Sequence, residues 1–224
     1  MALAYDYKDA HSPLAAPPKR AVEPTSALVR MGLTMTFAKD EEIYGQDEDA
    51  DLIYRVLEGA VRTTRFMADG RRQIGDFYLA GDIFGLETGP RHRFAAEAVR
   101  DSAVLVVKAS ALRAAGGDIE RLGWETTRRE LERAQEHVLL LGRKTACERV
   151  ASFLKDLSDK GGSPAVVDLP MGRQDIADYL GLTIETVSRM LSQLQSGRIV
   201  SFCATRQFRV VNPQGLARLA DQAQ

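Results

Sequence analysis

The chain has 224 residues, of which 45% are hydrophobic and 27% are charged, and this composition is typical of a soluble protein with one or two folded domains. The formal net charge is −1, which excludes a polycation that coats nucleic acid without sequence selectivity, so any contact with DNA must be local. The two cysteines, Cys147 and Cys203, lack CxxC spacing. That excludes a disulfide framework and a four-cysteine metal or iron–sulfur site, and it favours a reducing compartment.

Neither a membrane span nor a signal peptide is expected. No run of about 18 apolar residues occurs, and the N-terminus lacks a basic segment followed by an apolar one. The first 25 residues are rich in proline and show no sustained periodicity, which is typical of a poorly ordered arm. We therefore expect a cytoplasmic protein without membrane contact, whose residues 1–30 form a flexible arm.

Residues 31–113 are predicted to form an antiparallel, jelly-roll-like β-roll. Short apolar or alternating runs such as "LTMTFA", "IYRVLEGAVRTTRFM" and "AVLVV" are separated by turn residues. Gly59 and Gly70 stand where hairpins need a positive φ or a tight bend, and Asp69-Gly70 is the strongest turn signal. Many short strands followed by helices predict an α+β fold.

Residues 114–142 are predicted to form a long dimerisation helix. Apolar or small side chains recur at steps of three and four residues, at Leu131, Ala134, Val138, Leu141 and Thr145. This stripe is narrow and close to the a/d spacing of coiled coils, so a two-helix seam in a homodimer accounts for it better than burial in one chain. Packing wholly within one chain is the alternative.

Residues 143–224 are predicted to form a winged helix-turn-helix domain. A helix over "ACERVASFLKDLSDK" ends before Gly161-Gly162, and "RQDIADYLGLTIETVSRMLSQLQ" holds two helix-sized pieces around Gly181. Gly181 supplies the turn, and Thr183 is a suitable N-cap for the second helix. Two strand-like runs in "GRIVSFCATRQFRVVNP" predict a β-hairpin wing beside it.

The second helix of the pair carries three polar residues opposite its apolar side. Glu185, Ser188 and Arg189 fall at i, i+3 and i+4 and share the outward face. Arginine offers two donors to guanine O6 and N7, glutamate accepts from cytosine N4, and serine is adaptable. These residues are therefore predicted to read base edges in the DNA major groove. The alternative is a solvated Glu185–Arg189 ion pair worth about 0.2–0.5 kcal/mol.

Further residues are predicted to hold the DNA backbone or to assist base reading. They stand at the starts of the two helices and at the wing turn, where contacts to phosphate position a protein without specifying a sequence. This accessory set is Arg173, Gln174, Thr183, Ile184, Thr186 and Arg206. Ordinary solvated side chains are the alternative for its charged members.

Residues 30–220 resemble the CRP/FNR superfamily of bacterial transcription regulators, particularly its FNR and FixK branch. The similar segments are "IYRVLEGAVRTTRFMADGRRQIGDFYLAGDIFG", "LLLGRKTACERVASFL" and "YLGLTIETVSRML", of which the last is the most specific. The resemblance implies that Glu185, Ser188 and Arg189 read TTGA-type half-sites in an inverted repeat, which a twofold homodimer matches. It also implies recruitment of RNA polymerase, mainly as an activator, at genes used when oxygen is scarce.

The chain departs from the cofactor-binding members of that superfamily. FNR holds an iron–sulfur cluster with N-terminal cysteines, which this arm lacks. Cyclic-nucleotide-binding members carry Arg followed by Ser or Thr, whereas here Arg93 is followed by Phe94. His92 is the one histidine of the roll and is expected at the surface, so haem is not expected. The FixK type, with no cofactor and no metal, fits best.

Other hypotheses remain open. The second is a ligand-switched sensor whose roll binds an unidentified small molecule to control DNA binding. Cys147 and Cys203 are candidate redox residues, because one lies just beyond the dimerisation helix and the other on the wing; buried structural thiols are the alternative. An enzyme is not expected, since no nucleophile–base set, paired-carboxylate motif or metal-ligand spacing occurs.

Overall fold

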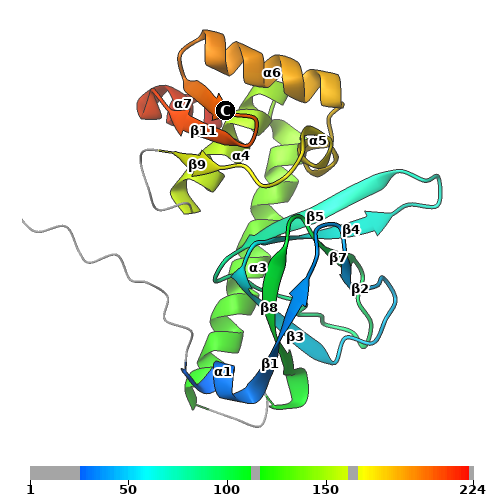
Figure 1. Ribbon diagram of the computed structural model, residues 1–224. Coiled ribbons are helices and arrows are strands. Elements are labelled where there is room, and N and C mark those ends of the chain that lie inside the picture. The colour runs from blue at the N-terminus through cyan, green and yellow to red at the C-terminus, as the bar shows by residue number, and fades with distance from the viewer. Residues whose placement is uncertain (1–25, 112–116, 161–165, 222–224) are drawn as a thin grey trace, which may run out of the picture.

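The computed structural model describes residues 26–111, 117–160 and 166–221. A β-roll lies at one end, a long helix runs along it, and a smaller domain of helices and a short sheet lies at the other end (Figure 1). This is the α+β organisation expected from the sequence. Of the helices in these three ranges, none is long and apolar enough to cross a membrane.

Two antiparallel four-stranded sheets form the roll and confirm the predicted β-roll. In order across the first sheet, the strands are β1 (Gly32–Phe37), β8 (Ser102–Lys108), β3 (Leu52–Glu58) and β6 (Ile83–Phe84). Across the second they are β2 (Glu42–Tyr44), β7 (Ala95–Ala98), β4 (Ala60–Phe66) and β5 (Arg72–Leu79). Gly59 and Gly70, at the two predicted turns, have φ values of 93° and 82°, which glycine adopts without strain.

Aromatic rings fill the space between the two sheets. Tyr44, Tyr54 and Phe84 have ring centroids 5.0 to 6.2 Å apart, and Tyr78 joins them 5.2 Å from Phe84. His92 lies in the same cluster with 1% of its surface exposed, and its ring stacks on Tyr44 at 3.7 Å. The expectation of a surface histidine is therefore wrong, because the imidazole packs here as an aromatic ring.

A short helix, α1 (Ser26–Met31), precedes the first strand and covers the outer face of the first sheet. Leu28 is 3% exposed and packs with Leu105 and Val107 of β8. The end of the predicted arm is thus part of the packed roll, because Leu28 finds an apolar surface there. Residues 1–25 of that arm lie outside the described residues.

Helices α3 (Gly117–Arg143) and α4 (Ala146–Lys160) lead from the roll to the C-terminal domain. The bounds of α3 lie close to those predicted for the dimerisation helix. Leu131 and Val138 are 59% and 69% exposed, and Ala134 is exposed as well. These three residues, which we name the α3 stripe, are left uncovered by the parts of both domains that the structure describes.

The C-terminal end of the predicted stripe differs from expectation. Leu141 is half-buried and packs against the core of the C-terminal domain. Thr145 lies beyond α3, where its amide donates to Glu148 Oε2 (2.8 Å) and its hydroxyl accepts from the Glu148 amide (3.4 Å). Thr145 therefore caps the start of α4 and does not continue the helical stripe of α3, and its contact with a second subunit stays a prediction.

The C-terminal domain is a winged helix-turn-helix, as predicted. Its elements are β9 (Val167–Asp168), α5 (Arg173–Leu180), α6 (Ile184–Ser196), β10 (Val200–Ala204), β11 (Gln207–Val210) and α7 (Pro213–Asp221). The strand order β10-β11-β9 adds a third antiparallel strand to the predicted two-stranded wing. Leu154, Ile176, Leu180, Leu191 and Phe208 are almost fully buried and form the centre of its core.

The roll and the C-terminal domain also pack directly against each other. Phe77 of β5 lies 6.1 Å from the ring of Phe153 in α4 and 5.3 Å from the ring of Tyr179 in α5. One apolar cluster therefore contains buried side chains from both domains. Burial of this shared surface holds the helix-turn-helix against the roll.

An ion-pair network beside this contact joins the same two domains. Arg62 of β4 donates to Asp175 of α5 at 3.2 Å, and Arg72 of β5 donates to Asp175 at 2.6 Å and to Asp178 at 2.7 Å. Arg62 and Asp175 are 8% and 7% exposed. Because charges this buried need partners, the four residues, which we name the junction cluster, fix α5 on the roll.

Candidate DNA interface

Local sequence builds the turn between α5 and α6. Gly181 has φ 61° and ψ 40°, a left-handed conformation that suits glycine at the end of a helix. The amide of Leu182 donates to the Ala177 carbonyl at 2.9 Å and closes α5. The Thr183 hydroxyl then accepts from the Thr186 amide at 3.3 Å and caps α6, as predicted.

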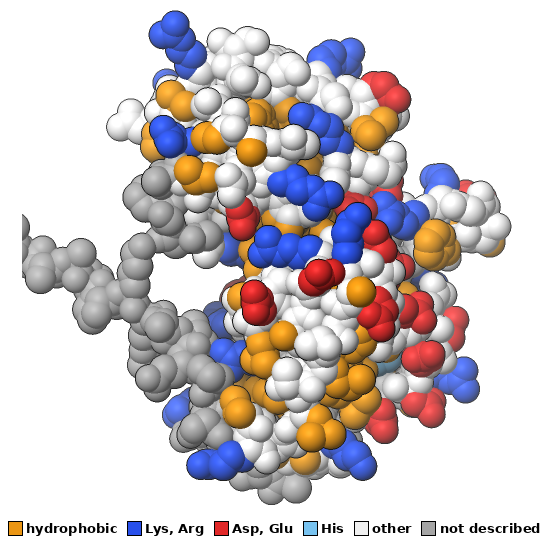
Figure 2. All heavy atoms as spheres, viewed as in Figure 1, with side chains coloured by type: hydrophobic (Ala, Val, Ile, Leu, Met, Phe, Trp, Pro, Cys, Tyr) orange, Lys and Arg blue, Asp and Glu red, His pale blue; other side chains and the backbone are white. Residues whose placement is uncertain are grey.

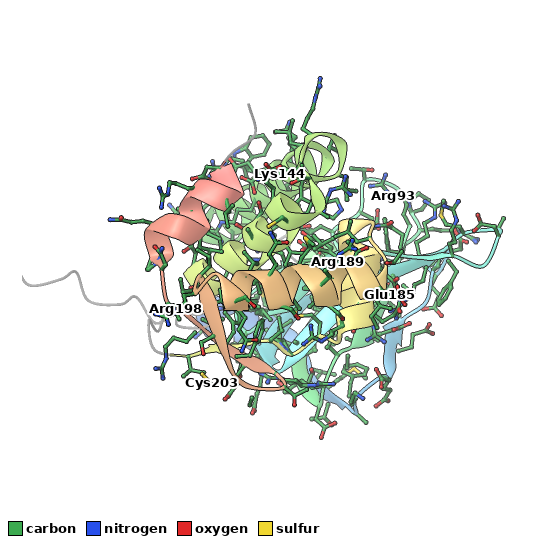
Figure 3. The ribbon with its side chains drawn as sticks, turned by 90° about the horizontal axis from the view of Figure 1, so that it is seen from above. Arg93, Lys144, Glu185, Arg189, Arg198 and Cys203 are labelled. Atoms are coloured by element: carbon green, nitrogen blue, oxygen red, sulfur yellow. The ribbon has the colours of Figure 1, made fainter. Side chains whose placement is uncertain are left out.

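Helix α6 separates a buried apolar face from an outward polar face. Its buried residues are Val187, Leu191 and Leu194. Glu185 and Arg189 are exposed, and Ser188 is half-buried. Figure 3 shows Glu185 and Arg189 on the N-terminal half of α6, which lies across the outer surface of the domain. The structure thus brings the three predicted base-reading residues together on one accessible side.

Glu185 and Arg189 are not paired with each other. The ion pairs at i,i+4 within the described helices are Arg128–Glu132 and Lys155–Asp159. The Glu185 carboxylate instead accepts hydrogen bonds from its own backbone amide and from the Thr183 hydroxyl. These bonds, the first more than the second, keep the pKa of the carboxyl below its usual range. It is therefore ionised at neutral pH, and the ion-pair alternative is not what the structure contains.

Three accessory residues surround the start of α5. Arg173 and Gln174 are exposed there, and Gln174 Nε2 donates to Asp178 Oδ1 at 2.7 Å. Arg206, at the turn between β10 and β11, donates from Nη1 to the Pro170 carbonyl at 2.9 Å. This bond ties the wing to the segment before α5, so Arg206 has a structural role besides any phosphate contact.

The other three accessory residues lie at the start of α6. Ile184 is 37% exposed, and the hydroxyls of Thr183 and Thr186 are 3.1 Å apart. Helix N-termini favour phosphate because their first amide groups have no partner within the helix. Contact of these residues with DNA stays a prediction.

Arg149 of α4 positions the helix-turn-helix, and sequence reasoning did not find it. Its guanidinium donates to the carbonyls of Lys144 (2.9 Å), Leu180 (2.9 Å) and Leu141 (2.7 Å). These bonds join the end of α3 to the end of α5. The segment "ACERVASFL" carries no signal for this role, because the acceptors are backbone atoms, one of them 31 residues away.

The roll residues compared with cyclic-nucleotide sites are engaged within the chain. Arg93 pairs with Glu87 at 3.2 Å between Nε and Oε2. A Cβ placed on Gly75 would come within 3.0 Å of the Phe94 ring, so this ring packs closely on β5. Over the described part of the chain, no group of three or more His, Cys, Asp or Glu side chains is arranged to hold a metal.

The two cysteines differ in accessibility. Cys147 is half-buried at the start of α4, and burial together with Glu148 raises the pKa of its thiol, which disfavours the reactive thiolate. Cys203 is exposed on β10 of the wing (Figure 3). Cys203 is therefore the more accessible of the two candidates, and a redox role for either stays a prediction.

A β-roll, a long helix and a winged helix-turn-helix with unpaired charges on its second helix define a DNA-binding transcription regulator. Two family models match the chain: the cyclic nucleotide-binding domain over residues 34–116 and the Crp-like helix-turn-helix domain over residues 148–219. The chain belongs to the CRP/FNR family of transcription regulators, as its motifs predicted. Members of this family are regulators rather than enzymes.

The relatives place the chain near FixK. The nitrogen fixation regulation protein FixK of Azorhizobium caulinodans is 46% identical over 207 residues, which cover 89% of this chain and 84% of that protein. FixK of Rhizobium meliloti is 39% identical over 189 residues, 84% of this chain and 88% of that protein. The structure of FixK2 from Bradyrhizobium japonicum superposes with a TM-score of 0.82 at 49% identity, covering 86% of this chain and 99% of that one. The predicted FixK-like resemblance is confirmed.

Proposed function

We propose that this regulator binds DNA as a homodimer and reads a TTGA-type inverted repeat with Glu185, Ser188 and Arg189. The observation that carries the proposal is the outward face of α6, where an exposed carboxylate and an exposed guanidinium lie one turn apart without pairing. The guanine–cytosine pair of each half-site offers acceptors to Arg189 and a donor to Glu185. Ser188 adapts to the neighbouring base.

The α3 stripe supports the dimer. Leu131, Ala134 and Val138 have coiled-coil spacing, and residues 26–111, 117–160 and 166–221 leave them exposed. A twofold seam along α3 would give the pair of α6 helices the symmetry of an inverted repeat, with half-sites about one helical turn apart. Two α6 helices on two half-sites make twice as many base contacts as a single α6 makes on one.

The relatives suggest the regulated genes. FixK proteins are named for the regulation of nitrogen fixation, and two of them match most of this chain. We therefore propose that the protein mainly activates genes for low-oxygen metabolism through RNA polymerase, without an iron–sulfur cluster or cAMP.

Selection of duplexes from a random pool by the purified full-length chain tests the proposal. We expect enrichment of TTGA-type half-sites in inverted repeats. The Arg189→Ala chain should lose preference for the guanine, whereas Arg218→Ala, which removes an exposed arginine on α7, should select the wild-type site. Enrichment of single half-sites, or of no motif, would contradict the proposal.

A further inference from the structure

A cavity of about 500 Å³ lies between the outer face of the first roll sheet and the N-terminal part of α3. Its apolar wall includes Ile53, Leu86, Val107, Leu122 and Trp124. The elements around it, α1, β3, β8 and the adjoining part of α3, lie together in the roll half of Figure 1, where Figure 2 also shows many hydrophobic side chains at the surface. Small-molecule sites typically measure about 300–1,000 Å³, so the cavity is large enough for an organic ligand.

This cavity lies on the outer side of the first sheet, and Tyr54 is the residue of the aromatic core that also lines it. Side chains of β3 alternate between two faces, so that Val56 packs between the sheets while Ile53 and Arg55 line the cavity on the outer side. Neither Arg93 nor Phe94 lines it. The cavity is therefore separate from the place where a cyclic nucleotide would be expected.

Arg55 is the charged residue of the cavity wall, as far as the structure describes that wall. Only 5% of its surface is exposed, and its Nε has no hydrogen-bond partner among the residues that the structure describes. Burial lowers the pKa of its guanidinium, and no carboxylate of the described residues offsets that effect. A largely buried guanidinium is stabilised by a negatively charged neighbour, so Arg55 offers the cavity one site for an anion.

We propose that the cavity binds an amphipathic organic monocarboxylate, with the carboxylate on Arg55 and the apolar body against Leu122 and Trp124. A guanidinium and a carboxylate form two parallel hydrogen bonds, which suits one planar anion. The remaining wall is largely apolar and suits an alkyl chain or an aromatic ring.

A nucleotide or a sugar phosphate does not fit this chemistry. Such ligands carry several polar groups, whereas the Thr126 and Thr127 hydroxyls of the wall already donate to the carbonyls of Leu122 and Gly123. A phosphate dianion would also meet one buried cation only. The structure therefore favours a singly charged ligand with a large apolar part.

Trp124 connects the cavity to the α3 stripe. It is 72% exposed and stands two turns before Leu131 on the same helix. A ligand that packs on Trp124 changes the surface available to a second subunit, so occupancy would be coupled to dimerisation. The binding itself is independent of the proposed DNA reading, and its test uses no DNA.

The chain has a single tryptophan, so its fluorescence reports on this cavity directly. Decanoate and 4-phenylbutyrate would be titrated against 1-decanol and 4-phenylbutan-1-ol, with calorimetry in parallel. We expect a blue shift of Trp124 emission and at least tenfold tighter binding of one or both acids than of the matching alcohol. The stronger acid shows whether the natural ligand is aliphatic or aromatic.

Two pairs of variants locate the site. Arg55→Met should abolish the preference for acid over alcohol, whereas Arg65→Met, at an exposed position on β4, should keep it. Gly123→Phe fills the cavity at a position where a Cβ meets no atom within 4 Å, and it should abolish binding. Gly142→Phe, at an equally open position further along α3, should bind as wild type. Binding of neither acid, equal binding of acid and alcohol, or an unchanged Arg55→Met chain would overturn the proposal.

Discussion

The helix-turn-helix carries two charged faces that differ in the burial and in the pairing of their side chains. On α6, Glu185 and Arg189 are exposed and leave each other unpaired. On α5, Asp175 is buried and bonds to both Arg62 and Arg72. A satisfied, buried charge holds one domain on the other, whereas exposed charges that do not pair with each other can contact a partner outside the chain. The two faces therefore separate the orientation of the domain from its recognition of DNA.

The largest loss of stability is expected from a substitution in the junction cluster, on the buried charged face of α5. Asp175→Ala leaves Arg62 and Arg72 with only part of their partners, and it also removes the acceptor for the Gly172 amide. We expect the free energy of unfolding to fall by about 3 kcal/mol, measured by urea denaturation.

Asp159→Ala is the matched control, because it breaks the exposed Lys155–Asp159 pair and should cost less than about 1 kcal/mol. Equal losses in the two variants would show that the junction cluster does not hold the domains together.

The α3 stripe is exposed in a single subunit, as the α6 face is, and it should become buried when two subunits form the dimer. Leu131→Asp places a charge on each side of the proposed seam. Burial of a leucine contributes about 1.5–3 kcal/mol, so the dissociation constant of the dimer should rise at least tenfold in sedimentation equilibrium. Arg129→Asp, an exposed change off the stripe, should leave it unaltered. A monomeric wild-type chain would contradict the seam.

Buried titratable groups should govern how stability depends on pH. Burial lowers the pKa of His92, so the unfolded chain takes up the proton first as the pH falls below about 6.5. The stability that neutral His92 contributes is complete above that pH and is lost below it, by at most about 1.4 kcal/mol per pH unit.

His92→Phe keeps the ring that stacks on Tyr44 and removes this titration. The half-buried carboxyls of Asp76 and Glu130, whose pKa values are raised, act in the opposite direction to His92. They contribute equally in both chains, so the difference between the two curves isolates His92. Parallel curves of unfolding free energy between pH 5 and 7, about the range in which histidine titrates, would contradict this origin.

Substitutions on the outward face of α6 should change the free energy of unfolding least. Glu185→Gln and Arg189→Ala remove exposed groups that leave each other unpaired, so each should change the free energy of unfolding by no more than about 0.5 kcal/mol. A loss comparable to that of Asp175→Ala would mean that these residues support the fold rather than serve an external partner.

Local features of the site could be predicted from the sequence, and long-range ones could not. Gly181 and Thr183 act on neighbouring backbone atoms, so their residue types were sufficient signals. The α6 face followed from helical periodicity alone. The Arg62–Asp175 pair joins residues 113 positions apart, and no local pattern indicates that β4 meets α5.

Periodicity also failed where two partners compete for one apolar residue. The a/d spacing placed Leu141 and Thr145 on the dimer stripe, but Leu141 packs against the C-terminal domain and Thr145 caps α4. The spacing predicts that a side chain is buried, but it does not indicate which surface buries it. His92 shows the same limit, because a single histidine in a sequence carries no sign of the rings that surround it.

The most direct test measures anisotropy of a labelled TTGA inverted repeat and of the same duplex with the guanine replaced in both half-sites. For the wild-type dimer we expect a preference of about 1–3 kcal/mol per half-site for the guanine, and for Arg189→Ala equal affinity for the two duplexes with an intact dimer. An Arg189→Ala chain that still distinguishes the duplexes as the wild type does would contradict the assignment of the outward face of α6 as the reader of DNA.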